Sequence, residues 1–367
     1  MEIDRTTLDR LLPGLRERLA EVSLTELESE KNPGIEIFRT LGGTNLLVPK
    51  EHGGLGADAL DAVRVMRALA AVAPSTAVAT MMHQFSVSTM VAAVSFGAES
   101  GVNPALLDSI TQNQLLLSSA FAEGRTDQDI LQPTMTATPV EGGFLVSGTK
   151  KPCSLSRSMN LMTASVALPS EHSITGLGIA VIPADAEGLS VHPFWSSFVL
   201  AGAESDEVRL TDVFVPAEQM VAPPIEQAIM LQMTGLVHFQ LSVSAAYTGI
   251  ASALVQRVLE RGRGSVTDRA DLAVRIESAA LATEAVARQL IAGDPIHTTL
   301  AAAQVARFAA QQTIGEVVNR AVELLGGMAY VSSSDVAYLA AASHGISFHP
   351  PSRSSAASSI VDYFTAG

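Results

Sequence analysis

Apolar residues recur at helical spacing along the first third of the chain. The segment from Ala59 to Phe96 is rich in Ala, Met and Val. Pro74 interrupts it once, which predicts that one helix ends there as the next begins. Before it, the stretch "VPKEHGGLGAD" carries three glycines and is typical of a sharply turning loop. The pattern predicts an N-terminal helical domain over residues 1–115.

From about residue 116 the period of the pattern changes to two. The stretch "TMTATPVEGGFLVSGTKK" alternates apolar and polar residues on both sides of Glu141-Gly142-Gly143, which indicates a β-hairpin. "NLMTASVAL", "GLGIAVIPA" and "DEVRLTDVFVP" predict further strands. We therefore expect a central β-domain, a barrel or sandwich, over residues 116–224.

Residues 225–367 are predicted to be helical again. A long helix to about Arg261 precedes two more, with Asp268 expected as an N-cap and Gly293 and Gly326 as stops. Short connections favour antiparallel neighbours, so a four-helix bundle is expected. Together the three parts predict an α+β multidomain fold.

The stretch from Gln227 to Gln256 carries no charged residue and is long enough to cross a bilayer. It nevertheless contains many polar side chains that lipid would leave unsatisfied, six of them between residues 232 and 244. These six are Gln232, Thr234, His238, Gln240, Ser242 and Ser244. The stretch therefore predicts a helix inside the bundle, and no membrane association is expected.

Composition excludes some classes of protein. The 367 residues carry a formal net charge of −14 and no basic run, which argues against nucleic-acid binding. The single cysteine, Cys153, allows no internal disulfide. The charged, amphipathic N-terminus does not resemble a signal peptide, so a cytoplasmic location is expected. No spaced group of His, Cys and carboxylate side chains predicts a metal site.

His349 precedes two prolines in "GISFHPPSR" near the C-terminus. A residue before proline is pushed into extended geometry, and Pro350 and Pro351 suit the first turn of a helix. The positive end of that helix would keep His349 neutral and able to accept a proton, as a general base must. The alternative is that His349 only caps or packs at the helix start. His238 is open to two interpretations too, a buried histidine with one hydrogen-bond partner or a pocket residue facing substrate.

Several motifs resemble acyl-CoA dehydrogenases, in the order and spacing of that family. "VPKEHGGLG" resembles "vPeeyGGlG", "AEGRTDQD" occupies the place of "TEPGAGSD", and "GGFLVSGTKKPCS" resembles "gdgyvlnGtKrfIT". "LTDVFVP" and "ELLGGMAY" resemble "f.dV.VP" and "QilGGnGY". The resemblance implies helices, then a β-domain, then a four-helix bundle, and it covers residues 45–360.

The resemblance implies FAD as cofactor, with FMN or an exchangeable reduced flavin as alternatives. It places Ser154 at the hydroxyl that reaches flavin N5. The remaining positions that it matches to flavin contacts are Ala122, Gln128, Gly326, Gly327 and Pro351. Ala122 replaces the family's threonine, Gln128 a serine, and Pro152 the aromatic residue beside the flavin.

His349 stands where the family keeps its catalytic glutamate, in "FHPPS" instead of "YEGTS". The second position at which the family can supply that carboxylate, on the first bundle helix, lacks one too, because "LVHFQLSVSAAYTG" has no Asp or Glu. We expect oxidation of an acyl thioester, bound to CoA or a carrier protein, with His349 in place of the glutamate. His349, Ser154 and His238 are the candidate catalytic residues.

Two other functions stay open. Some relatives on this fold are monooxygenases that lack the glutamate, take reduced flavin from a separate reductase, and use a serine near flavin N5 and a histidine near the last helix. Ser154, His349 and His83 fit those parts. The other alternative is a flavin-free binding scaffold. The resemblance further implies a homodimer or homotetramer, with a flavin reductase or electron acceptor as partner.

Overall fold

The structure is a computed structural model that describes residues 1–97, 101–124, 132–169, 171–173 and 176–365. The chain folds into two compact units. The first, which we call the helical unit, comprises Met1–Ile37, Ala57–Met81 and Leu236–Gly367. The second, the sheet unit, comprises Phe38–Gly56 and Met82–Gly235. The division at residues 115 and 224 follows the order of element types and stays a prediction.

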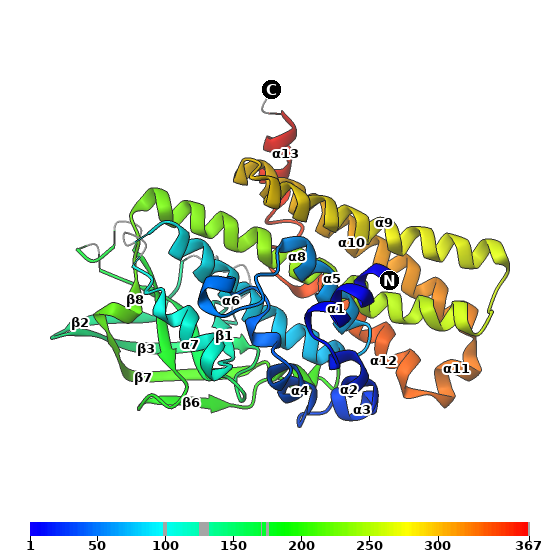
Figure 1. Cartoon of the computed structure of the whole chain (residues 1–367), viewed down its shortest axis with the longest axis horizontal. Coiled ribbons are helices and arrows are strands. Elements are labelled where there is room, and N and C mark those ends of the chain that lie inside the picture. The colour runs from blue at the N-terminus through cyan, green and yellow to red at the C-terminus, as the bar shows by residue number, and fades with distance from the viewer. Residues whose placement is uncertain (98–100, 125–131, 170, 174–175, 366–367) are drawn as a thin grey trace. The chain divides into compact units, whose positions relative to one another are not determined.

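The N-terminal part of the chain is helical, as predicted (Figure 1). Its helices are α1 (Glu2–Leu11), α2 (Leu15–Ala20), α3 (Leu24–Leu27), α4 (Gly34–Thr40), α5 (Ala59–Ala70), α6 (Pro74–Ser95) and α7 (Ala105–Asn113), with short turns η1 (Gly43–Asn45) and η2 (Lys50–His52). Pro74 is the first residue of α6, because a proline in the first helical turn loses no intrahelical hydrogen bond.

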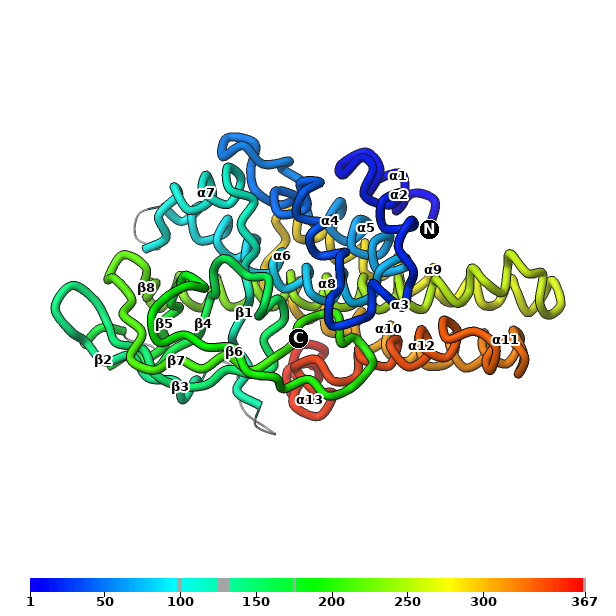
Figure 2. The backbone as a smooth tube through the Cα atoms, turned by 90° about the horizontal axis from the view of Figure 1, so that it is seen from below, coloured from blue at the N-terminus to red at the C-terminus, as the bar shows by residue number. Residues whose placement is uncertain are grey.

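The strands form one mixed sheet (Figure 2). They are β1 (Leu117–Ala120), β2 (Thr136–Val140), β3 (Gly143–Cys153), β4 (Leu161–Ala167), β5 (Leu177–Pro183), β6 (Leu189–His192), β7 (Asp206–Pro216) and β8 (Met220–Val221). The strand order is β6-β7-β3-β2-β4-β5-β8, and β1 pairs with β4 in parallel. The expected hairpin is β2–β3, whose turn lies between Val140 and Gly143. Val146, Met162 and Val208 lie in the buried core of this sheet.

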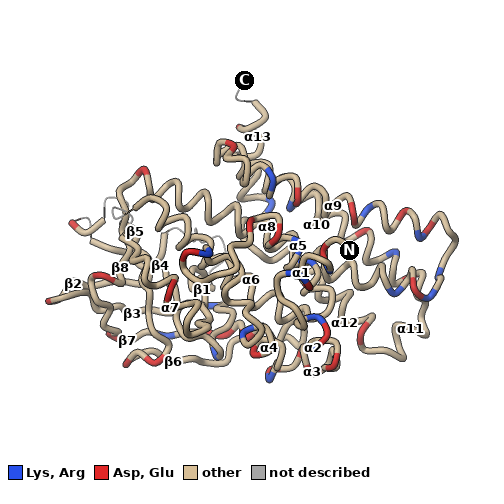
Figure 3. The backbone as a smooth tube through the Cα atoms, in the orientation of Figure 1, with Lys and Arg blue, Asp and Glu red and all other residues tan. Residues whose placement is uncertain are grey.

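The C-terminal part is helical and begins with the longest helix of the chain. Its elements are α8 (Ile225–Glu260), α9 (Val266–Ala292), α10 (Ile296–Leu325), α11 (Gly327–Ser332), α12 (Ser334–Ser343), η6 (His344–Phe348) and α13 (Ala357–Thr365). Figure 3 shows the long uncharged middle of α8. α6 and α8 are each long and apolar enough to cross a membrane by length and composition, a test that buried core helices pass as well.

Helix ends follow local chemistry, with one correction to the expected caps. Ser265, not Asp268, is the N-cap of α9. Its hydroxyl accepts from the Asp268 N–H while the Asp268 carboxylate accepts from the Ser265 N–H, so Asp268 is the third residue of a capping box. Gly293 ends α9 at a φ of 76°, a left-handed conformation that glycine adopts without strain. Gly326 ends α10, also as predicted.

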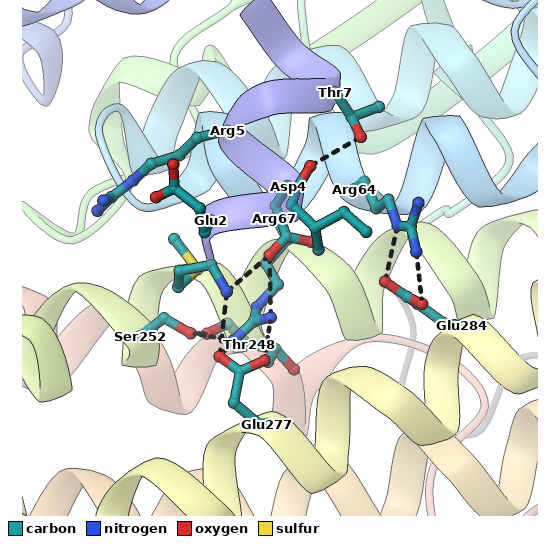
Figure 4. A network of polar contacts seen from close by, with 12 residues as sticks. Glu2, Asp4, Arg5, Thr7, Arg64, Arg67, Thr248, Ser252, Glu277 and Glu284 are labelled. Carbon is teal, nitrogen blue, oxygen red and sulfur yellow. Dashed lines mark hydrogen bonds and ion pairs between the residues drawn. The ribbon is translucent and has the colours of Figure 1, made fainter.

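A buried ion-pair network joins α1, α5, α8 and α9 within the helical unit (Figure 4). The Arg67 guanidinium on α5 is 2% exposed. It donates to Asp4 at 3.1 Å, to Glu277 at 2.7 and 3.0 Å, and to Ser252 at 3.1 Å. Burial alone would raise the pKa of Glu277, but its hydrogen bonds to Arg67 and to the N-terminal ammonium, together with the charges of these two groups, outweigh burial and lower it. The network holds the N-terminal helix on the bundle.

Replacing Arg67 with Met is expected to reduce the free energy of unfolding by about 3–5 kcal/mol, because buried Asp4 keeps only the N-terminal ammonium of its two cationic partners. Urea unfolding measures the change. The control is Arg18→Met, which removes an exposed pair with Glu21 and should cost less than about 1 kcal/mol. Equal losses in the two variants would contradict the structural role of the network.

Candidate active site

His349 lies in extended backbone between η6 and α13, with φ −79° and ψ 142°, as a residue before proline should. The expected helix start at Pro350 and Pro351 is wrong, because α13 begins only at Ala357. The intervening serines use their hydroxyls locally: Ser352 Oγ accepts from the Ser355 N–H at 3.1 Å. A hydroxyl that accepts from the N–H three residues later is the pattern of an N-cap, so the turn towards α13 starts after Ser352 and not at the prolines. His349 is therefore not at a helix N-terminus.

The His349 ring packs against two aromatic residues of α8. The Tyr247 hydroxyl is 2.8 Å from Nε2, and the two ring centroids are 5.3 Å apart. The Phe239 ring meets the His349 imidazole edge-to-face, with the two ring centroids 6.0 Å apart. Both residues belong to the stretch "LVHFQLSVSAAYTG". The structure thus brings together the two places where the resemblance expects a carboxylate, and neither place supplies one.

A buried arginine on α10 holds the main chain around His349. Arg307 is fully buried and donates to the carbonyl oxygens of four residues in the segment from Ile346 to Pro351. Its Nη1 also donates to Gln240 Oε1 at 3.1 Å. Sequence reasoning missed Arg307, although it is the only charged residue between positions 298 and 315. That isolation in an apolar helix was the available signal.

His349 is neutral, as expected, but for a different reason. Burial, together with the positive charge of Arg307, lowers its pKa to about 3. The expected effect of a helix N-terminus does not apply, because α13 begins only at Ala357 and His349 does not lie at its start. Burial also raises the pKa of Tyr247, so its hydroxyl keeps its proton at neutral pH.

His238 lies apart from this group. Tyr247 follows it by nine residues, about two and a half helical turns, so the two side chains leave opposite faces of α8. Burial lowers the pKa of His238 to about 4. The structure gives it no hydrogen bond to any residue that it describes, which does not match the one-partner interpretation. Its catalytic role stays a prediction.

Ser154 and Ala122 lie on neighbouring segments of the sheet unit. The Lys151 N–H donates to the Ala122 carbonyl at 2.8 Å, and Ser154 follows directly after β3. The Ser154 hydroxyl is 3.0 Å from that of Ser205, and its carbonyl accepts from Ser118 Oγ at 2.6 Å. One hydroxyl neighbour leaves Ser154 Oγ with hydrogen-bonding capacity to spare. Gln128 lies outside the described residues.

A buried ion pair fixes this region of the sheet unit. Lys150 Nζ is 2.8 Å from Glu123 Oε1 and 3.0 Å from Ser165 Oγ. The same carboxylate accepts from the N–H groups of Thr134 and Met135. Because its oxygens are used in this way, Glu123 orders the chain beside Ala122 and does not serve as a base.

The remaining candidates occupy structural positions. Gly326 and Gly327 form the junction of α10 and α11, and the Pro351 carbonyl is one of the Arg307 acceptors. Their roles in cofactor binding stay predictions. Cys153 is buried in the sheet core, where burial raises the pKa of its thiol to about 12, so it is not an activated nucleophile. No cluster suited to a metal ion occurs among the residues with described positions.

His83 is a structural histidine. Its Nδ1 accepts from the Leu117 N–H at 3.1 Å, so Nε2 carries the proton that is donated to the Thr44 carbonyl at 3.0 Å. Burial lowers its pKa to about 4. Because both ring nitrogens are used by the backbone, His83 does not fit the monooxygenase part that it was expected to play.

Comparison with known proteins gives concordant results. The family "Acyl-CoA dehydrogenase, N-terminal domain" matches residues 15–100, and "Acyl-CoA dehydrogenase, C-terminal domain" matches residues 229–346. Isobutylamine N-hydroxylase of Streptomyces viridifaciens is 48% identical over 100% of this chain and 98% of its own. The solved structure of KijD3 in complex with dTDP has a TM-score of 0.84 at 20% identity, covering 99% and 97% of the two chains. TdsC from Paenibacillus sp. A11-2, with FMN and indole, has a TM-score of 0.82 at 17% identity, covering 100% and 98%.

These matches confirm the predicted fold class and correct the predicted reaction. The expectation of acyl-thioester oxidation is wrong, because the relative that matches the whole chain at 48% identity is an amine N-hydroxylase. The physical reason is visible around His349, where no carboxylate occupies either expected place. The monooxygenase alternative agrees better with this finding.

The buried, neutral state of His83 predicts a pH dependence of stability. Below about pH 6.5 the unfolded chain binds a proton at this residue, whereas the folded chain binds one only near pH 4. The contribution of neutral His83 to the free energy of unfolding is therefore fully present above pH 6.5 and is lost as the pH falls towards 4. When the pH is lowered from 7 to 5, the free energy of unfolding of His83→Gln should fall by about 2 kcal/mol less than that of the wild type.

Urea unfolding at the two pH values measures this difference. An unaltered pH dependence in His83→Gln would show that His83 is not held neutral.

Proposed function

This chain belongs to the acyl-CoA dehydrogenase superfamily and is a flavin-dependent oxidoreductase, and from that premise we propose that it hydroxylates the nitrogen of small primary aliphatic amines. The observation that carries the proposal is the 48% identity to isobutylamine N-hydroxylase over the whole chain. The flavin-free scaffold loses its support with this assignment.

The residues around His349 suit oxygenation better than desaturation. Removal of an α-proton from a thioester needs a base fixed beside the substrate. Phe239 and His349 meet where the family would place its carboxylate, and the pKa of about 3 makes His349 a weak base. A neutral imidazole can still donate a hydrogen bond to a reacting oxygen.

The proposed reaction consumes one amine, one dioxygen and one reduced flavin. It yields one hydroxylamine, one water and one oxidised flavin. The O–O bond breaks, one oxygen is inserted into an N–H bond, and the other leaves as water with the two hydrogens given up by the reduced flavin. Bound reduced flavin supplies two of the four electrons that reduce dioxygen, and the amine nitrogen supplies the other two.

The surroundings of His349 favour the neutral form of the amine. An ammonium ion has no lone pair and cannot form the N–O bond. Among the described residues no carboxylate contacts His349, and Arg307 brings a positive charge to its main chain. Both features disfavour an ammonium ion beside the imidazole.

The residues of the sheet unit fit a flavin that exchanges. Ser154 Oγ has spare hydrogen-bonding capacity at the position that the resemblance assigns to flavin N5. Ala122 and Pro152 replace residues whose family counterparts contact FAD, which supports a reduced FMN or FAD delivered by a separate reductase.

Exposed apolar side chains on α9, such as Val274 and Leu281, support a homodimer or homotetramer.

With isobutylamine, reduced FMN and air, the wild-type protein is expected to form N-isobutylhydroxylamine, detected by mass spectrometry. His349→Ala should lower product formation by at least about 100-fold, because a positioned proton-carrying group is lost. His344→Ala is the matched control, since this exposed histidine lies in the adjoining η6 and should change nothing. Undiminished product from His349→Ala would remove His349 from the mechanism.

A further inference from the structure

The state of the His349 ring is set by two residues of the bundle that contact it or its main chain. Tyr247, from α8, is 1% exposed, and its hydroxyl has His349 Nε2 as its hydrogen-bond neighbour. Arg307, from α10, contacts the main chain on both sides of the same histidine. Both belong to the helical unit, so these contacts lie within one compact body.

The direction of the Tyr247–His349 hydrogen bond follows from the need to satisfy the buried hydroxyl. The structure shows no other acceptor for the Tyr247 O–H among the residues it describes. If Nε2 carried the proton and donated it to Tyr247, the phenol O–H would be buried without a partner, which costs free energy. Tyr247 therefore donates to Nε2. A neutral imidazole then carries its proton on Nδ1.

The position of the ring is fixed through its main chain. Arg307 Nη1 lies 3.1 Å from the Pro350 carbonyl and 3.0 Å from that of Pro351. Nη2 donates to the carbonyls of Ile346, at 3.2 Å, and His349. Only a planar group with several N–H donors can serve acceptors on both sides of one residue in this way.

Two further contacts tighten the same segment. Gln240 accepts from Arg307 Nη1 at 3.1 Å and so orients the guanidinium. A Cβ atom at Gly345 would lie 2.7 Å from the Tyr247 hydroxyl oxygen, so η6 packs closely against that phenol. Among the described residues, the polar groups that contact the His349 imidazole or hold its main chain are thus a cation, a phenol and an amide, and the ring of Phe239 adds an apolar contact. None of them is a carboxylate that would favour a protonated ring.

We infer that Arg307 and Tyr247 are positioning residues, and that through them His349 acts as a neutral hydrogen-bond donor at Nδ1 instead of as a base. Nδ1 makes no hydrogen bond within the described part of the chain, so its N–H is available to an oxygen of the reaction. Arg307 sets where the ring lies, and Tyr247 sets which nitrogen carries the proton. Neither residue needs to touch substrate.

The protonation of the ring is measured directly by NMR on the full chain labelled with ¹⁵N-histidine. His349→Gln identifies the His349 signals by their loss. We expect a neutral ring with the proton on Nδ1 from pH 8 to pH 6, and a mixture of the two tautomers in Tyr247→Phe. Tyr338→Phe is the control, because this hydroxyl donates to Glu28 and does not contact His349. A proton on Nε2 in the wild type, or an unchanged spectrum in Tyr247→Phe, would overturn the inference.

Turnover gives the second measurement. Arg307→Lys keeps the charge but loses the planar fork, so the loop should shift while the protein still folds. We expect kcat for amine hydroxylation to fall by roughly 10- to 100-fold with little change in KM, as misplacement of a reacting group does. Hydrogen peroxide formed per dioxygen should rise. Arg64→Lys is the matched control, because it weakens a bidentate pair with Glu284 elsewhere in the helical unit.

Since these effects on turnover rest on the proposed N-hydroxylation, the two measurements can fail separately. Wild-type kcat and coupling in Arg307→Lys, or an equal loss in Arg64→Lys, would overturn the role of Arg307. If the wild type hydroxylates no amine, the proposed function fails, and the ¹⁵N spectra of wild type, Tyr247→Phe and Arg307→Lys still decide how the ring is held.

Discussion

The Arg307 guanidinium is the contact on which the arrangement around His349 depends. It is buried and serves four main-chain carbonyls and one amide oxygen, with no carboxylate in ion-pair contact among the described residues. Burial lowers its pKa to about 10, which still leaves it charged at neutral pH. A buried cation is costly unless it is hydrogen-bonded, and the bonds from Nη1 and Nη2 tie the loop from Ile346 to Pro351 to α10. Arg307 therefore fixes the position of the loop and adds to the effect of burial in keeping the imidazole neutral.

The same charge separates this site from that of a dehydrogenase. A carboxylate base beside the substrate would be attracted to Arg307, and its proton affinity would fall. A neutral imidazole suits the position, because it bears no charge and can donate a hydrogen bond. The chain keeps the scaffold of its superfamily, and on the inference above the group at this position changes from an acceptor of protons to a donor of hydrogen bonds.

Local patterns in the sequence were enough for the fold, because helical and strand periods, the Pro74 break and the Gly293 stop depend on nearby residues. They were not enough for the site. Tyr247 and His349 are 102 residues apart, and no local pattern indicates that they meet. The helix start at Pro350 and Pro351 is wrong because the serines that follow offer a capping hydroxyl at Ser352, which places the turn towards α13 later in the chain. Resemblance to the superfamily does not determine the reaction, because one scaffold can support different chemistries; the missing carboxylate is the local feature that argues against a dehydrogenase.

Incorporation of labelled oxygen tests the central claim most directly. The protein is supplied with a primary aliphatic amine, reduced FMN and ¹⁸O₂, and the hydroxylamine is analysed by mass spectrometry. The account predicts one ¹⁸O atom in each hydroxylamine and the other in water. Product without ¹⁸O, or oxidation of an acyl thioester with no amine product, would contradict it.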